Sequence, residues 1–177
     1  MEKKKTLIDD LIGALTCLPG VGKKTAQRMT YHLLQRGKED ALNLSDILKE
    51  TVLKTQNCKS CRTLCQGEYC EICSDPSRND DVLCIVESPA DIMNIENSTN
   101  YHGKYFVLNG KLSPLDGIGP NEIGLDMLNE KLSSGLVKEL ILAVNYTVES
   151  DVTAHVISDI ALKNSIKVTR LAQGVPV

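Results

Sequence analysis

Large aromatic side chains are almost missing from this sequence. Tryptophan is absent from its 177 residues and phenylalanine occurs once, so a buried core must be built mainly from aliphatic side chains. Hydrophobic residues nevertheless make up 42% of the chain, which is enough for a packed core. The length predicts one ordinary domain or two small ones.

Long apolar runs are missing as well. No stretch approaches the roughly 18 consecutive apolar residues that indicate a membrane-spanning helix. The first residues, MEKKKTLIDDL, form a charged amphipathic start without the apolar centre of a secretory signal. We therefore expect a cytoplasmic protein with no membrane partner.

The net charge of −3 conceals an uneven distribution. Residues 1–57 carry ten Lys and Arg against seven Asp and Glu, a balance of +3, whereas residues 58–177 carry ten against sixteen, a balance of −6. Because nucleic acid is a polyanion, a nucleic-acid partner is expected to bind the N-terminal third.

Four of the seven cysteines form two closely spaced pairs. Cys58 and Cys61 make one Cys-x-x-Cys turn, and Cys70 and Cys73 make a second one after eight intervening residues. Two such turns offer the four thiolates that tetrahedral Zn²⁺ prefers. Four protein ligands leave no open position for water or substrate, so we expect a structural zinc ion.

Disulfides or a redox dithiol are the alternative interpretation of these pairs. Seven cysteines cannot all pair, however, and no secretory signal precedes them, so zinc is favoured. Cys65 lies between the pairs at a spacing that fits neither turn, and Cys17 and Cys84 fall in apolar runs. We expect these three to be ordinary small side chains.

Apolar residues at helical spacing flank a glycine-rich stretch near the N-terminus. One run covers residues 7–15 and stops before Leu18-Pro19-Gly20-Val21-Gly22, and a second covers 26–34 and ends before Gly37. Two helices are thus predicted to meet at a hairpin. A further apolar pattern over residues 42–53 predicts a third helix.

The hairpin has the residues of an anion-binding turn. Gly20 and Gly22 allow backbone conformations closed to other residues, so successive amides can form an anion-binding nest at the start of the second helix. The positive end of that helix adds to the attraction, and Lys23, Lys24 and Arg28 lie in its first two turns. A DNA phosphate fits such a site, which predicts contacts to the DNA backbone rather than to bases.

Two other interpretations apply to the same residues. A P-loop, G-x-x-x-x-G-K-[ST], is excluded because its first glycine would fall at Cys17 and Lys24 stands where Ser or Thr is needed. A helical pattern rather than a strand also precedes it. A tight helix–helix turn without a ligand stays open, since Pro and Gly punctuate connections of every kind.

Strand-like and helix-like stretches alternate beyond a polar joint at residues 75–81. Strands are predicted at 82–86, 105–108, 140–144 and 166–171, and helices from a capped start at Ser88-Pro89, at 121–132 and at 153–162. This order predicts an α/β fold with a mostly parallel sheet covered on both faces. Ligand sites of such sheets lie at the carboxyl ends of the strands, where Glu87, Glu149 and Asp151 can gather.

Several motifs together resemble the RecR family of bacterial recombination mediators. They are LPGVGKKTAQR (18–28), the four cysteines, CSDPSR (73–78), IVESPADI (85–92), LSPLDGIGP (112–120), TVES-D (147–151) and GVPV (174–177). The resemblance covers essentially the whole chain. It implies a helix-hairpin-helix DNA-binding domain at 1–56, a four-cysteine zinc finger at 57–78 and a Toprim domain at 79–177.

The resemblance also implies a function and partners. The chain is expected to bind single- and double-stranded DNA without sequence preference and to act in recombinational DNA repair. With RecO and RecF proteins it would load recombinase onto gapped DNA. It is expected to form a homo-oligomer, either a dimer or a ring of four.

The sequence departs from the family pattern at three places. Lys23 stands where the family usually has Pro, so the matching DNA contacts are Lys24 and Arg28, with Lys23 an added charge. Tyr146 and Ser150 replace the Pro and Gly of the acidic loop pattern N-P-T-V-E-G-E. The chain ends at Val177 where the family continues, and we expect this end to favour a dimer through the N-terminal helices over a closed tetramer.

The Toprim resemblance raises the question of catalysis. Toprim enzymes hold Mg²⁺ with acidic residues at positions matched by Glu87, Glu149 and Asp151, so both a divalent ion and simply solvated loops stay open here. No room is left for a nucleophile-bearing cleavage domain or a nucleotide-handling apparatus, so we expect a mediator rather than an enzyme. A minimal Toprim-type nuclease or primase-like enzyme is the alternative.

Overall fold

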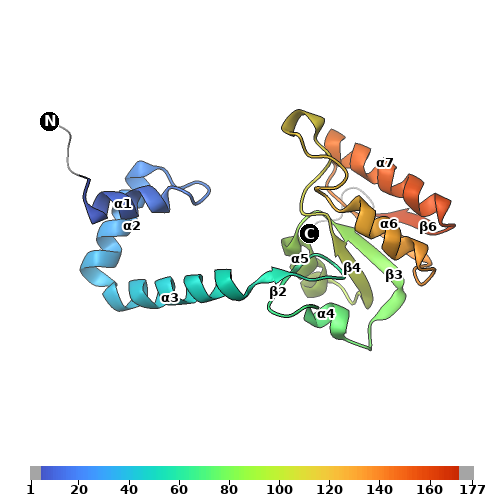
Figure 1. Ribbon diagram of the computed structural model, residues 1–177, viewed down its shortest axis with the longest axis horizontal. Helices are drawn as coiled ribbons and strands as arrows, with labels where there is room; N and C mark the ends of the chain where they lie inside the picture. The colour runs from blue at the N-terminus through green and yellow to red at the C-terminus, as the bar shows by residue number, and fades with distance from the viewer. Residues whose placement is uncertain (1–4, 172–177) are drawn as a thin grey trace. The chain divides into compact units, whose positions relative to one another are not determined.

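The computed structural model describes residues 5–171, and of Leu115 the backbone alone. The chain divides into two compact units, Met1–Lys54 and Thr55–Val177, which are described separately (Figure 1). The GVPV motif (174–177), with the expectation attached to the chain end at Val177, lies outside the described residues.

The N-terminal unit consists of three helices, α1 (Leu7–Leu15), α2 (Lys23–Arg36) and α3 (Lys38–Lys54). Thr6 and Asp9 form a capping box at the start of α1, where the Asp9 carboxylate accepts from the Thr6 amide at 3.0 Å. Gly37 separates α2 from α3. All three predicted helices are confirmed, and α3 begins four residues earlier than its apolar pattern suggests.

The cysteine-rich part opens the second unit. A two-stranded antiparallel ribbon, β1 (Gln56–Asn57) and β2 (Leu64–Cys65), is followed by the single turn of α4 (Glu71–Ser74). Ile72 of α4 packs both on the cysteine cluster and on the core of the following sheet. The cysteine-rich part is therefore joined to the sheet by apolar contacts.

A four-stranded parallel sheet organises the rest of the second unit. Its strands are β3 (Asn79–Val86), β4 (Gly103–Val107), β5 (Glu139–Ala143) and β6 (Lys167–Arg170), in the order β4-β3-β5-β6 (Figure 1). Each neighbouring pair runs parallel, with Ile85 beside both Phe106 and Leu142. The predicted α/β fold with a parallel sheet is confirmed.

Helices connect the strands and cover the two faces of the sheet. They are α5 (Pro89–Ser98), the short 3₁₀ helix η1 (Pro114–Asp116), α6 (Leu125–Ser133) and α7 (Val148–Lys163). The helix predicted at 121–132 starts only at Leu125, because Gly124 adopts a left-handed φ of 75°. The helix predicted at 153–162 starts earlier, because Thr147 caps it by accepting from the Ser150 amide at 3.2 Å.

The core lies on both faces of the sheet. One face packs Leu83, Ile85 and Phe106 against α6 and α7, and Phe106, the one phenylalanine of the chain, is fully buried. The other face packs Val86 and Val107 against α5. Apart from Phe106 and Tyr105, the largest fully buried side chains are aliphatic, as the composition predicts. Within residues 5–171, no helix is both long and apolar enough to cross a bilayer.

Candidate metal centre and nucleic-acid interface

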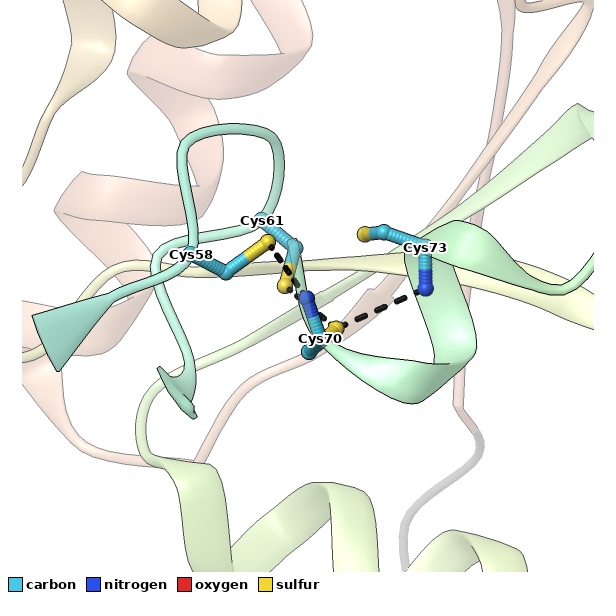
Figure 2. A group of neighbouring side chains, drawn as sticks. All are labelled: Cys58, Cys61, Cys70 and Cys73. Atoms are coloured by element: carbon cyan, nitrogen blue, oxygen red, sulfur yellow. Dashed lines mark hydrogen bonds between the residues drawn. The ribbon is translucent and has the colours of Figure 1, made fainter. Parts of the chain in front are cut away.

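Cys58, Cys61, Cys70 and Cys73 come together in the second unit, with their sulfur atoms all within 4.8 Å of one another (Figure 2). The first turn is closed by the Arg62 amide, which donates to the Cys58 carbonyl at 2.9 Å, and the Cys58 Sγ accepts from the Cys70 amide at 3.3 Å. In the second turn Cys70 caps α4, and its Sγ accepts from the Cys73 amide at 3.4 Å. Amides that donate to sulfur stabilise thiolates, so both turns are built to hold ligating cysteines.

Two of the clustered thiols have pKa values that are shifted in opposite directions. A hydrogen bond from Cys61 is the largest cause that lowers the pKa of Cys73, to about 5, whereas burial raises the pKa of Cys70 to about 11. Zn²⁺ allows all four to ionise, and four adjacent cysteine sulfurs are a donor set that fits it.

The other three cysteines lie outside this group of ligands. The Cys65 thiol, which packs against the cluster, donates to the Gly67 carbonyl at 2.9 Å. Cys84 is buried in the sheet, where burial raises its pKa to about 12, and Cys17 is exposed in the N-terminal hairpin. None of the three belongs to the four-sulfur group.

The hairpin between α1 and α2 exposes all five residues proposed for DNA contact. Gly20 has a left-handed φ of 77°, and Gly22 caps α2 without a side chain that could bind its first amides. Lys23 and Lys24 open the helix, and no acidic residue lies in that turn. Within the part of the chain that the structure describes, Lys23, Lys24 and Arg28 form no ion pair.

Two lysines at the start of a helix are electrostatically unfavourable for the helix itself. Cations next to the positive end cost a few tenths of a kcal/mol to about 1 kcal/mol each at low ionic strength. Free amides, two ammonium groups and the Arg28 guanidinium one turn further on instead suit an external anion. The arrangement can bind a phosphate without contacting a base.

Glu87, Glu149 and Asp151 lie at the carboxyl end of the sheet, as the sequence predicts, but each has a different internal partner. The Glu87 carboxylate accepts from the Asn145 side chain at 2.6 Å and from the Ser150 hydroxyl at 2.5 Å. Glu149 pairs with Lys111 at 3.3 Å, and Asp151 pairs with Arg170 at 2.5 Å.

The carboxylates Glu87, Glu149 and Asp151, which we call the acidic edge, are held apart by these pairings. The amide of Glu149 itself, then the Lys111 ammonium, lower the pKa of the Glu149 carboxyl, so the group stays ionised near neutral pH. Among the described residues, the four cysteines are the one group of three or more side chains close enough to share an ion. In this conformation the three carboxylates do not converge on a common Mg²⁺ position.

Comparison with known proteins follows the same division of the chain. A family model described as "RecR, helix-hairpin-helix" matches residues 8–52, and one for a Toprim domain matches residues 81–172. The Recombination protein RecR of Methylococcus capsulatus is 54% identical over 169 residues, which are 96% of this chain and 85% of the relative. The chain belongs to the RecR family.

Two further RecR relatives agree. That of Saccharophagus degradans is 52% identical over 171 residues, covering 97% of this chain and 87% of the relative. That of Alcanivorax borkumensis is 49% identical over 174 residues, covering 98% and 87%. The family resemblance read from the motifs is thereby confirmed.

Sequence reasoning missed two arginines that connect the parts of the second unit. Arg78 donates to both carboxylate oxygens of Glu96, at 2.9 and 2.5 Å, and Tyr105 donates to the same carboxylate at 2.6 Å. Arg62 reaches across to four backbone carbonyls of the sheet domain. Arg62 directly follows the first Cys-x-x-Cys pair and Arg78 follows the second by five residues, but neither position predicts a bond to a carbonyl or carboxylate far away in sequence.

Proposed function

We propose that this chain is a DNA-binding recombination mediator that acts without turnover. Membership of the RecR family supports a role in recombination and repair. The observation that carries the DNA-binding part is the exposed cationic start of α2, where Gly20, Gly22, Lys23, Lys24 and Arg28 surround amides that no side chain caps. The protein works in the cytoplasm on single- and double-stranded DNA.

A comparison of two doubly substituted variants tests the DNA site. Lys24→Ala with Arg28→Ala removes two charges from the hairpin, whereas Lys38→Ala with Lys49→Ala removes two exposed charges from α3 in the same unit. If the hairpin binds phosphate, only the first variant loses affinity, equally for all sequences, by about tenfold or more. Equal affinities of the two variants would leave the hairpin as a turn without a ligand.

The proposed zinc ion braces the second unit. Cys58, Cys61, Cys70 and Cys73 hold one Zn²⁺ per chain, and the finger has little apolar core of its own beyond Ile72. Elemental analysis of freshly purified protein is expected to give one equivalent of zinc. Less than half an equivalent would refute the assignment. The domain limits that we propose stay at 1–56, 57–78 and 79–177.

We assign the acidic edge to partner docking rather than to catalysis. RecO and RecF proteins are the proposed partners for loading recombinase, and Glu87, Glu149 and Asp151 are the proposed contact residues. Their separate internal pairings support this assignment, because a phosphoryl-transfer site needs carboxylates free to share Mg²⁺. A Glu149→Gln variant is expected to weaken partner binding and leave DNA binding intact.

The alternative is a minimal Toprim-type nuclease or primase-like enzyme, for which the Toprim match is the supporting observation. Incubation of labelled DNA with Mg²⁺ or Mn²⁺ separates the two functions. The mediator leaves the strands unchanged. Cutting or extension that Glu87→Gln abolishes would establish the enzyme instead.

We further propose that the N-terminal helices form a homo-oligomer. Leu48 and Val52 lie one helical turn apart on α3 with exposed fractions of 59% and 69%, and other large apolar side chains of α1 and α3 are also exposed. A second copy of the same helices would cover them. Light scattering is expected to show an oligomer that Leu48→Glu dissociates and that Leu162→Glu, an equally exposed site on α7, does not.

A further inference from the structure

Arg62 is a partly buried cation that is bound by carbonyl groups alone. Its guanidinium donates to Val107 and Leu108 at 3.3 and 3.0 Å, to Glu122 at 2.8 Å and to Ile123. Its central carbon also lies 5.9 Å from the centre of the Phe106 ring. Burial lowers the pKa of this group, and no carboxylate of the described chain forms an ion pair with it.

Burying a cation without a counter-ion costs free energy, but the hydrogen bonds of Arg62 fix the Cys58–Cys61 turn relative to the segment after β4 in one direction. Desolvation of the charge is offset mainly by the carbonyl dipoles, with a smaller contribution from the Phe106 ring, so the interaction depends on the hydrogen bonds staying in place. The planar guanidinium presents its N–H groups in a fixed fork, which a lysine cannot reproduce. Arg62 is therefore suited to fixing positions rather than to adding net stability.

The metal turn fixes the backbone of Arg62. The residue follows the ligand Cys61 directly and has a left-handed φ of 65°, which is strained for a residue with a side chain. Its amide donates to the Cys58 carbonyl at 2.9 Å, and the Cys61 carbonyl accepts from the Val107 amide at 2.8 Å. These two hydrogen bonds hold the strained geometry and so direct the guanidinium toward its carbonyl partners.

The other end of the contact lies on residues 108–124, which we call the β4–α6 segment. It carries the LSPLDGIGP motif, which no function proposed above uses. It also lines an apolar pocket of about 440 Å³, together with Val152 of α7. Gly124, with its φ of 75°, leaves room for Arg62, since an added Cβ would lie 2.6 Å from the guanidinium carbon.

We propose that Arg62 makes the conformation of the β4–α6 segment depend on the occupancy of the four-cysteine site. The proposal rests on the zinc binding proposed above. When the metal is present, the Cys58–Cys61 turn presents the guanidinium to both ends of the segment. When the metal leaves, Arg62 relaxes from its left-handed conformation, its bonds to the carbonyls break, and the segment opens while the sheet, held by its own core, stays folded.

Hydrogen exchange of the full chain, followed by mass spectrometry with and without a zinc chelator, tests the proposal. Chelation is expected to raise exchange in residues 108–124 by about tenfold or more, because several hydrogen bonds to a charged group break. Arg62→Ala with zinc still bound is expected to raise it as much, and chelation of this variant to add nothing there. Lys59→Ala, in the same turn but paired with Glu68 on the surface, is the matched control that keeps the wild-type response.

A second measurement uses the reciprocity of coupling. If zinc stabilises the segment through Arg62, removal of the Arg62 side chain lowers zinc affinity by the same factor, which a competition titration with a chromogenic chelator measures. Gly124→Ala crowds the guanidinium from the opposite side. Because Ala at this left-handed φ also strains the segment itself, the readout for this variant is zinc affinity alone, which is expected to fall as it does in Arg62→Ala. Lys131 of α6 also contacts this turn, through the Ser60 hydroxyl at 2.7 Å and the Ser60 carbonyl at 3.3 Å, and Lys131→Ala is expected to leave the segment protected.

Two results would overturn the proposal. One is unchanged exchange in the segment after complete zinc removal. The other is a further rise in hydrogen exchange of residues 108–124 when the Arg62→Ala variant is treated with chelator, which would mean that contacts other than those of Arg62 couple the segment to the metal site. Metal analysis of the parent protein separates these results from a failure of the zinc assignment itself, since a chain that binds no zinc shows no metal at the start.

Discussion

The two units of this chain bury their side chains very differently. In the described part of the N-terminal unit only Ala26, Thr30 and Gly37 are buried, whereas the second unit packs both faces of a parallel sheet. The first unit leaves most of its apolar and cationic side chains exposed, whereas the second is stabilised by its own core. Substitutions should therefore affect stability in the second unit and association in the first.

Removal of the proposed zinc ion is expected to have the largest effect, and to destabilise the second unit alone. Structural zinc sites contribute on the order of 10 kcal/mol of apparent binding free energy, and the finger has few other contacts to replace it. A Cys61→Ser variant is expected to lose zinc and to lower the thermal midpoint of the second unit, as calorimetry would show. Circular dichroism of a fragment of residues 1–54 gives the control, because its helicity should not respond to chelator.

A core substitution compares the units directly. Ile85→Ala, at a fully buried position in the sheet, is expected to cost about 2 to 5 kcal/mol in the free energy of unfolding. Leu53→Ala on α3, with 74% of its surface exposed, is expected to cost less than about 0.5 kcal/mol in the dissociated chain. Denaturant unfolding measures both, and similar costs would mean that α3 is buried in solution.

Thr30 sharpens the comparison within the N-terminal unit. Its hydroxyl is fully buried and has no hydrogen-bond partner in the described chain. Thr30→Val keeps the shape and removes an unsatisfied polar group, so it is expected to be neutral or to stabilise the unit by up to about 1 kcal/mol. A loss of stability in Thr30→Val would show that the hydroxyl has a hydrogen-bond partner in solution.

The smallest expected effect concerns acid sensitivity of the second unit. Arg78, followed by other contacts, lowers the pKa of the Glu96 carboxyl below its usual 4.5. A carboxyl whose pKa is lower in the folded state than in the unfolded state stabilises the fold at pH values above its unfolded pKa. This stability is lost as the pH falls through the folded-state pKa. Glu96→Gln is therefore expected to be less stable than the parent at neutral pH by about 1 kcal/mol and to show a shallower loss of stability below pH 4.5.

Local patterns were sufficient to predict most of the fold. Apolar periodicity located most of the helices and strands, and the predicted cap at Ser88 is confirmed. The helix predicted at 153–162 starts at Val148, because the Thr147 cap was not recognised in the sequence. The gathering of Cys58, Cys61, Cys70 and Cys73 into one group also followed from their spacing alone. Each of these features depends on residues that are neighbours in sequence.

Contacts between distant residues could not be predicted in this way. The carboxyl end of the sheet was correctly expected to hold Glu87, Glu149 and Asp151, but their partners Ser150, Lys111 and Arg170 were not foreseen. Arg62 and the carbonyls that it binds are separated by 45 or more positions. Such contacts depend on the final packing, which periodicity does not describe.

A salt titration of DNA binding tests most directly the claim that the N-terminal unit binds phosphates. For the parent chain, the logarithm of affinity is expected to fall linearly with the logarithm of salt concentration. The Lys24→Ala, Arg28→Ala variant should have a shallower slope, by about 0.7 to 0.9 for each phosphate that the variant no longer binds. The Lys38→Ala, Lys49→Ala control should keep the parent slope. Parallel lines for the parent and the hairpin variant would contradict the account and place the DNA site elsewhere on the chain.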